Sequence, residues 1–232
     1  MRSYPIAFLI IFGFLLENSS CSKPAPTENS NNSIINQVEA VDTGSVDPRA
    51  DLEKVFQAIV DASSYRVVTS VESDNGQVQH REWEYRAPDR SHLILESNKL
   101  SDVRRETISI GTETFVKIGA EPWKKSPLSI LDKLVQFHPK EIADNIKKSS
   151  EIKYIGSEKI DGTQMRIFQY LTKSSLHPES ELIEKVWIGA SDGLIYQMES
   201  GVESIIDGQA VKTKKIAKIS AYNSEINIEK PM

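Results

Sequence analysis

The segment Tyr65–Ala87, YRVVTSVESDNGQVQHREWEYRA, decides the fold of this chain. Side chains alternate in type along residues 65–73 and again along 77–87, and such alternation indicates half-buried β-strands. Between them, Asp74-Asn75-Gly76 is typical of a tight turn that joins two strands. The segment therefore predicts an antiparallel hairpin. The side chains that share one face of its second strand are those of Arg81, Trp83 and Tyr85.

The same alternation continues on both sides of the middle of the chain. Three further turn signals follow the first, at Asp161-Gly162, Asp192-Gly193 and Asp207-Gly208. Short connections of this kind favour a meander of consecutive antiparallel strands with a strong twist. The further predicted strands are 92–97, 103–110, 114–118, 153–160, 164–172, 183–189, 194–201 and 211–222, with a last short piece at 226–228.

Three segments have the apolar spacing of helices, and we expect them to lie on one side of the sheet. The first begins at Pro48, with Asp47 as its N-cap. Its apolar stripe consists of Leu52, Val55, Phe56, Ile59 and Val60. The second covers residues 128–137, and its apolar positions are Leu128, Leu131, Leu134 and Val135. The third begins at Pro139, and its inward positions are Ile142, Ala143 and Ile146.

The first 21 residues have the features of an export signal. One basic residue precedes an unbroken apolar run, Ile6–Leu16, which is too short to span a membrane as a helix. Ser19 and Ser20 come directly before Cys21, the only cysteine in the sequence. This arrangement resembles the signals of bacterial lipoproteins, except that Asn18 stands where those signals usually carry an aliphatic residue.

The resemblance to lipoprotein signals implies a signal peptide over residues 1–20 and a lipid on Cys21. The alternative is an ordinary signal peptide cut nearby, which leaves Cys21 as a free thiol or in an intermolecular disulfide. Residues 21–47 are polar and predict a flexible tether, followed by a single domain over residues 48–232. Ser22 is not the aspartate that retains lipoproteins in the inner membrane of enteric-type bacteria. We therefore expect a lipid anchor in the outer membrane, facing the periplasm or the cell surface.

Composition and motifs argue against several classes of function. The formal net charge is −5, whereas a nucleic-acid-binding domain is usually basic. The histidines, at positions 80, 92, 138 and 177, do not have the spacing of metal ligands. The sequence contains no Gly-x-Ser-x-Gly motif and no glycine-rich phosphate loop. We expect no nucleic acid, no metal and no cofactor, and we favour a non-enzymatic protein over a hydrolytic or metal enzyme.

Three lysines share one face of the last long strand, at Lys212, Lys214 and Lys218. Lysines on an edge strand prevent edge-to-edge aggregation, and this is the interpretation we favour. The alternative is a contact with anionic headgroups or with an acidic protein partner in the envelope.

The order of the elements resembles that of the LolA-like superfamily of periplasmic lipoprotein and lipid carriers, including lipoproteins of the LppX and LprG type. The resemblance extends over Asp51–Pro231, nearly the whole expected domain. It depends on the order and spacing of several short pieces together, because each piece alone occurs in many meanders. These pieces are Tyr85–Arg90, Ile108–Gly111, Phe115–Lys117, Trp123, Tyr154–Gly162, Lys185–Gly189 and Asp192–Leu194.

The resemblance implies an α+β, mainly β fold: a twisted antiparallel half-barrel, not closed, with helices over its concave face. It further implies an apolar cavity between sheet and helices that accepts a lipid or the acyl chains of a lipoprotein. We expect Trp187 to lie on the outer face or at a rim, since it alternates with Val186 and Ile188. The candidate cavity residues are Phe56, Val67, Trp83, Tyr85, Ile94, Ile108, Ile110, Phe115, Leu131, Leu134, Ile142, Ile155, Ile167, Val186, Ile188 and Met198.

Overall fold

Strands account for most of the chain that the structure describes. The structure is a computed structural model, and it describes residues 47–98, 104–127, 137–173, 181–206 and 209–232, all within the compact unit Gly44–Met232. The strands are β1 (Ser64–Ser73), β2 (Val78–Arg86), β3 (Arg90–Ser97), β4 (Arg105–Ile110), β5 (Glu113–Ile118), β6 (Lys124–Lys125), β7 (Ile152–Ile160), β8 (Thr163–Lys173), β9 (Glu181–Gly189), β10 (Ile195–Ile206) and β11 (Gln209–Ser220). The helices are α1 (Pro48–Val60) and α3 (Pro139–Lys148).

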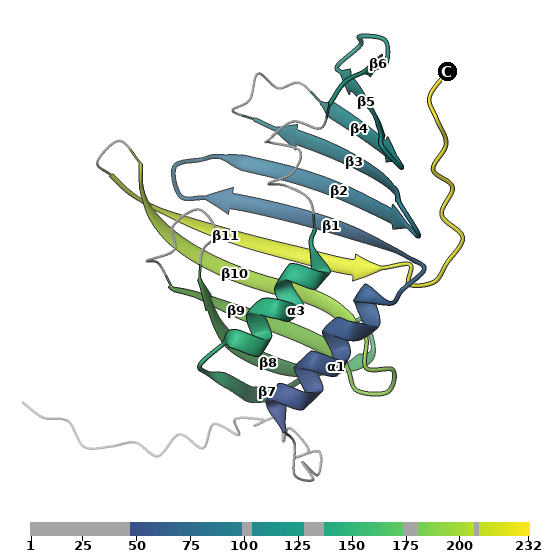
Figure 1. Ribbon diagram of the computed structural model, residues 1–232. Helices are drawn as coiled ribbons and strands as arrows, with labels where there is room; N and C mark the ends of the chain where they lie inside the picture. The colour runs from purple at the N-terminus through teal and green to yellow at the C-terminus, as the bar shows by residue number, and fades with distance from the viewer. Residues whose placement is uncertain (1–46, 99–103, 128–136, 174–180, 207–208) are drawn as a thin grey trace, which may run out of the picture. The chain divides into compact units, whose positions relative to one another are not determined.

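The strands form one 11-stranded antiparallel sheet in the order β6-β5-β4-β3-β2-β1-β11-β10-β9-β8-β7 (Figure 1). The predicted pairing of consecutive antiparallel strands is confirmed on both sides of the middle of the chain, and β7 lies at the edge farthest from β6. Two meanders, β1–β6 and β7–β11, are joined through the pairing of β1 with β11. The sheet does not close into a barrel, and the predicted open half-barrel with helices on one face is confirmed.

The first helix begins where the sequence predicts. The Asp47 side chain accepts hydrogen bonds from the backbone N–H groups of Arg49 and Ala50 at 3.0 and 3.2 Å, which satisfies two N–H groups that lack a helical partner. The predicted third helix, from Pro139, is also confirmed. The predicted helix over residues 128–137 and the predicted turn at 207–208 lie outside the described residues, except for residue 137.

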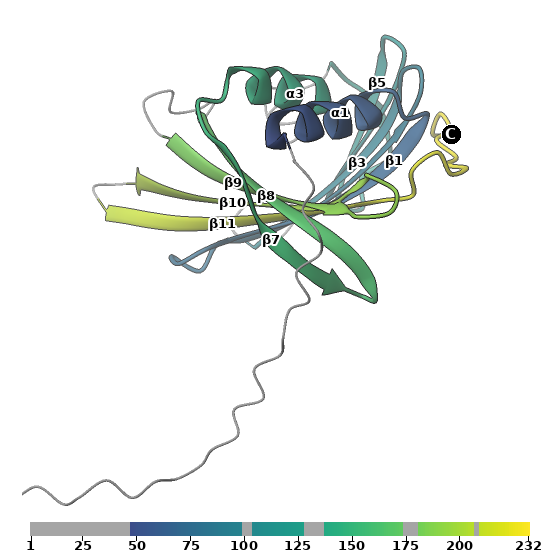
Figure 2. The same ribbon diagram turned by 90° about the horizontal axis from the view of Figure 1, so that it is seen from below.

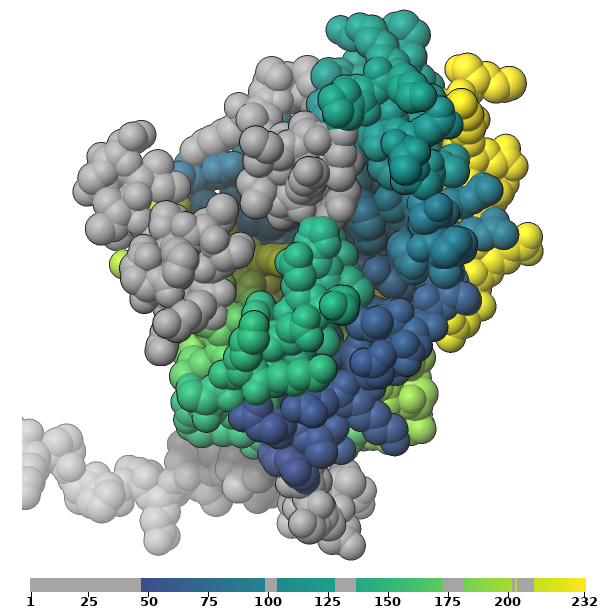
Figure 3. Space-filling view, in the orientation of Figure 1, coloured from purple at the N-terminus to yellow at the C-terminus, as the bar shows by residue number. Residues whose placement is uncertain are grey.

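The two helices pack on one face of the sheet, called here the helix-covered face (Figures 2 and 3). Helix α1 contacts β7, β10 and α3, and α3 contacts β8. The Arg49 guanidinium of α1 donates to the carbonyl oxygens of Ile146, Lys147 and Ser149 at 2.9, 3.3 and 2.6 Å. These carbonyls lie at the C-terminal end of α3, where the Ile146 carbonyl also accepts from the Ser149 N–H at 3.1 Å, so Arg49 both caps α3 and fixes it to α1.

The main core lies between the helices and the helix-covered face. Its buried members come from α1, α3 and seven strands, which shows that the sheet is continuous beneath the helices. They include Leu52, Phe56, Ile59, Val67, Leu93, Ile146, Phe168, Val186, Ile188 and Ile195. Burying such side chains contributes about 1.5–3 kcal/mol each, which is the main stabilisation of a domain without a disulfide.

The C-terminal segment covers part of the opposite face. Ile226 and Ile228 are buried there in a second cluster with Ile108. Their backbone carbonyls accept hydrogen bonds from Arg86 at 3.2 Å and Arg90 at 2.8 Å. The predicted strand over 226–228 is wrong, because this segment pairs with arginine side chains instead of a neighbouring strand.

The three lysines on the last long strand do not protect an edge. Their strand, β11, pairs with β1 on one side and with β10 on the other, so the edge-protection hypothesis is wrong. The side chains of Lys212, Lys214 and Lys218 are exposed on the face opposite the helices, and Lys214 pairs with Glu199 at 3.2 Å. The alternative hypothesis of a contact with an anionic partner stays untested.

Candidate functional site

The helix-covered face brings together eight of the sixteen candidate cavity residues. Six are buried members of the main core: Phe56, Val67, Trp83, Val186, Ile188 and Met198. Two are partly buried and pack against that core: Tyr85 and Ile142. Their role in holding a ligand is not tested by their burial and stays a prediction.

Six other candidates do not face the helices. Leu93 and Phe168 belong to the main core, so alternation turns Ile94 and Ile167 to the opposite face. The candidate cavity residues on the opposite face are Ile94, Ile108, Ile110, Phe115 and Ile167. Ile155 is 44% exposed beside the β-bulge at Gly156. Their predicted place in a cavity under the helices is wrong, while Leu131, Leu134 and Cys21 lie outside the described residues.

The apolar side chains on the opposite face have a structural explanation. Ile108 and Ile110 are covered by the C-terminal segment, and Lys230 Nζ lies 5.1 Å from the centre of the Phe115 ring. Trp187 is on this face, as expected, and its indole N–H donates to Glu158. Periodicity alone does not distinguish a strand face that is buried by helices from one that is buried by a terminal segment.

The register of the strands arranges the helix-covered face in rows. One row is apolar apart from Arg81 and Thr69, and it consists of Arg81, Thr69, Ala217, Met198, Val186 and Phe168. A second row lies two residues further along each of these strands, and Val71 is its apolar member. Its polar members, Gln79, Lys215, Ser200, Glu184 and Tyr170, are called here the polar row. An apolar surface thus changes to a polar one within a single step of the sheet.

Arg81 adds a second cation beside the polar row. It lies two residues from Gln79 on the same face of β2, and its guanidinium Nε donates to the Gln79 side-chain oxygen at 2.8 Å. Water reaches Arg81, Glu184 and Lys215, and Lys215 is the most exposed of the three. Sequence reasoning missed Glu184 and Lys215 as site residues. The sequence contained one sign of them: a charged residue two positions from an apolar one lies on the same face of the strand, as Glu184 does with Val186.

Packing on the sheet removes part of the water around the charged groups of this site, although the Lys215 side chain stays exposed. Loss of solvation raises the pKa of Glu184, against the attraction of Lys215 and a hydrogen bond from Ser200. Loss of solvation lowers the pKa of Lys215, against the attraction of Glu184, and the positive charge of Arg81 lowers it further. Loss of solvation also lowers the pKa of Arg81. Two cations therefore face one carboxylate.

A buried polar group lies close to the cations. Trp83 is 7% exposed, and its indole group acts on the neighbouring Tyr65 hydroxyl as a hydrogen-bond partner that lowers the pKa of Tyr65 against the effect of burial. It shares a face of β2 with Arg81, two positions away.

A separate pocket lies at the other end of the helix-covered face. It has a volume of about 600 Å³, and it lies beside β3, β4, β5 and β6. Its lining is mostly hydroxyl groups and contains one lysine: Ser91, Ser109, Gly111, Thr112, Thr114, Lys125, Ser126 and Pro127. Because Lys125 pairs with Glu113 at 2.7 Å, the pocket has no unpaired charge from its lysine.

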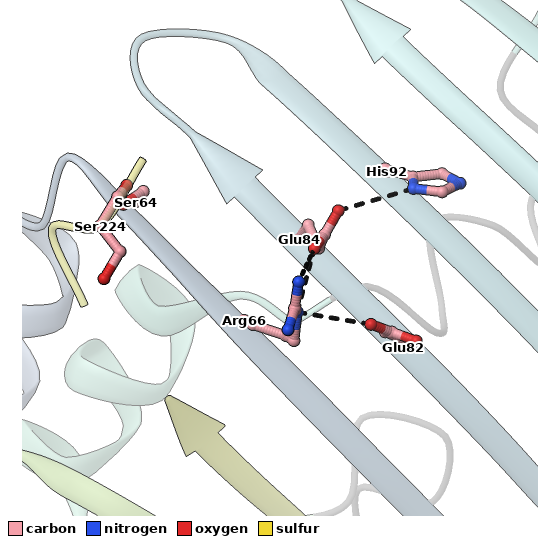
Figure 4. A network of polar contacts seen from close by, with 6 residues as sticks. All are labelled: Ser64, Arg66, Glu82, Glu84, His92 and Ser224. Atoms are coloured by element: carbon pink, nitrogen blue, oxygen red, sulfur yellow. Dashed lines mark hydrogen bonds and ion pairs between the residues drawn. The ribbon is translucent and has the colours of Figure 1, made fainter. Parts of the chain in front are cut away.

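The opposite face has a ladder of polar contacts that crosses β1, β2, β3 and β4, and Figure 4 shows its part on β1, β2 and β3. The Arg66 guanidinium contacts Glu84 at 2.5 Å and Glu82 at 3.4 Å. His92 lies 3.7 Å from Glu84 and 3.5 Å from Glu106. Such cross-strand pairs stabilise a sheet modestly. Within the described ranges, no three His, Cys, Asp or Glu residues are arranged to hold a metal, and no helix is long and apolar enough to cross a membrane.

Solved structures share this fold at low sequence identity. The lipoprotein LppX of Mycobacterium tuberculosis is 15% identical with a TM-score of 0.53, over 78% of this chain and 98% of LppX. LprF of Mycobacterium bovis is 13% identical with a TM-score of 0.55, over 79% of this chain and 96% of LprF. No protein-family model and no curated protein sequence matches the chain. The predicted resemblance to the fold of lipoproteins of the LppX type is therefore confirmed at the level of the fold.

Proposed function

We propose that this protein is a lipid-anchored, non-enzymatic binding protein of the bacterial cell envelope that holds a hydrophobic ligand. The ligand is a lipid or the acyl chains of a lipoprotein, and it lies against the helix-covered face. The observation that carries the proposal is this face, where apolar rows extend beneath two helices in a sheet that is not closed. Each buried methylene of an acyl chain contributes about 0.8 kcal/mol, so such a surface favours an acyl chain over water.

Two further observations support the proposal. The fold is that of LppX, which is itself a lipoprotein. The chain begins with the pattern of a lipoprotein signal that ends at Cys21. A long polar segment after that cysteine suits a protein whose first residue is fixed to a membrane, since a flexible segment lets the folded domain move away from the membrane surface. Placement in the outer membrane, facing the periplasm or the cell surface, is part of the proposal.

We expect lipid to co-purify with the mature chain, residues 21–232, carrying Cys21→Ser so that it stays soluble without detergent. Native mass spectrometry after expression in the periplasm should show added masses of lipid that disappear on denaturation. A uniformly ligand-free protein that also takes up no fluorescent fatty acid contradicts the proposal. A protein partner captured without lipid would favour the second candidate, an envelope interaction module, for which the exposed lysines of β11 are the specific observation.

The membrane anchor has its own test. In cells that produce the full chain, Cys21→Ser should move the protein from the membrane fraction to the soluble fraction, because a single cysteine is the only site for the lipid. Ser22→Ala is the matched control and should leave the protein in the membrane fraction. Equal fractionation of Cys21→Ser and the unchanged chain would contradict lipidation, and it would leave ligand binding by the domain unaffected.

A further inference from the structure

We propose that the ligand is an amphiphile with an anionic headgroup, a carboxylate or a phosphate, which is held between Arg81 and Lys215 on the helix-covered face. Its apolar chain follows the row Thr69, Ala217, Met198, Val186 and Phe168 towards the helices. This inference rests on the proposed function, because it names the chemical class of the ligand for the same face.

The register places the two cations close enough to bind one anion together. Arg81 pairs with Thr69 on β1, and Lys215 pairs with Val71 of the same strand. Arg81 and Lys215 are therefore two strand spacings apart sideways and two residues apart along the strands, about 12 Å between Cα atoms. Their long side chains rise from the same face and span much of this distance. The lowered pKa of Lys215 reflects in part the charge of Arg81, so the two groups interact.

The local charge balance favours an anion. Glu184 is the carboxylate of the polar row, and it shares the site with both cations. The Arg81 guanidinium donates to the neutral amide oxygen of Gln79, which orients it without neutralising it. Gln79 is itself buried, at 7% exposure, and this fixes the guanidinium in place. The site therefore carries one positive charge in excess, in a place where solvation is reduced.

The surroundings of the cations suit an amphiphile better than a free ion. Arg81 stands at the end of the row of Thr69, Ala217, Met198, Val186 and Phe168, in which Ala217, Val186 and Phe168 are buried. An amphiphile would place its headgroup against the polar row and its apolar chain against the apolar side chains of the same face.

The test compares two probes that differ only in charge, cis-parinaric acid and its methyl ester. The protein is the mature chain, residues 21–232, with Cys21→Ser, and fluorescence of the polyene measures binding. We expect the acid to bind at least about tenfold more tightly than the ester, since one charge-assisted hydrogen bond has this effect. Arg81→Gln and Lys215→Met should each weaken binding of the acid by about tenfold and leave binding of the ester within about twofold.

Lys214→Met is the matched control. It removes one positive charge from the same strand, but its side chain lies on the opposite face and pairs with Glu199. We expect it to change binding of neither probe. Glu184→Gln should strengthen binding of the acid several-fold, since it removes the competing carboxylate. Circular dichroism checks folding, and Arg81→Lys, which keeps the charge, should retain part of the preference if Arg81→Gln proves unstable.

The possible results separate the two proposals. If both probes bind equally to the unchanged protein, or if Arg81→Gln weakens both alike, the anionic-headgroup proposal is wrong and the binding of apolar ligands stands. If neither probe binds, both proposals are wrong. If millimolar inorganic phosphate displaces the acid completely, the site binds a free anion and the amphiphile assignment is overturned.

Discussion

Replacing Phe56 by alanine is expected to lower the free energy of unfolding by about 3–5 kcal/mol. Phe56 is fully buried on α1 and packs in the main core with strands from both meanders. Its loss leaves a cavity that rigid neighbours, a helix and a sheet, fill only in part. Urea denaturation of the lipid-free mature chain, followed by circular dichroism, measures the change.

Lys54→Ala is the control for Phe56→Ala. Lys54 lies on the exposed side of the same helix, and its replacement should change the free energy of unfolding by less than about 0.5 kcal/mol. A loss below about 1 kcal/mol for Phe56→Ala would mean that α1 does not pack on the sheet in solution. Bound lipid stabilises the folded state by mass action and must be removed from both variants before the comparison.

Replacing Asp51 by alanine is expected to cost about 1–3 kcal/mol. The Asp51 carboxylate of α1 accepts a hydrogen bond at 2.7 Å from Arg166 Nη1 of β8, and both side chains are about two-thirds buried, with exposures of 32% and 29%. Arg166 Nε is buried and has no partner among the described residues, so the guanidinium depends on this contact. Without Asp51, a charged group is left beneath the helix with its best partner removed.

A double-mutant cycle with Arg166→Met isolates this interaction. Arg166→Met keeps most of the side-chain volume above the Phe168 ring, which lies 5.6 Å from the guanidinium carbon. The double variant should be less destabilised than the sum of the single variants, with a coupling of about 1–2 kcal/mol. Additive effects would show that the ion pair does not hold α1 to β8.

Local signals in the sequence predicted the elements well, because each depends on neighbours in the chain. The Asp47 cap, the hairpin at Asn75-Gly76 and the helix from Pro139 were all correct. The order of the strands was not predictable in this way. Pairing of β1 with β11 depends on contacts between the two ends of the domain, and no turn signal reports them.

The candidate site was only half predictable for a related reason. Strands β3, β4 and β5 carry apolar side chains on both faces, because helices and core cover one face and the C-terminal segment covers part of the other. Alternation therefore did not show whether Leu93 or Ile94 faces the helices. The charged groups became recognisable as a site only when the register aligned Lys215 and Glu184 across three strands.

The central position of the β1–β11 pair has a consequence for how the chain folds. Each meander is built from neighbouring segments, so its strands can pair soon after they are synthesised or exported. The pair that joins the meanders includes Ser73 and Thr213, whose hydroxyl oxygens lie 2.8 Å apart although 140 residues separate them. Closing so long a loop is entropically costly and slow, which makes this pairing the natural rate-limiting step. Until it forms, the edges of both β1 and β11 are open, and the folding intermediate is most vulnerable to aggregation at the centre of the finished sheet.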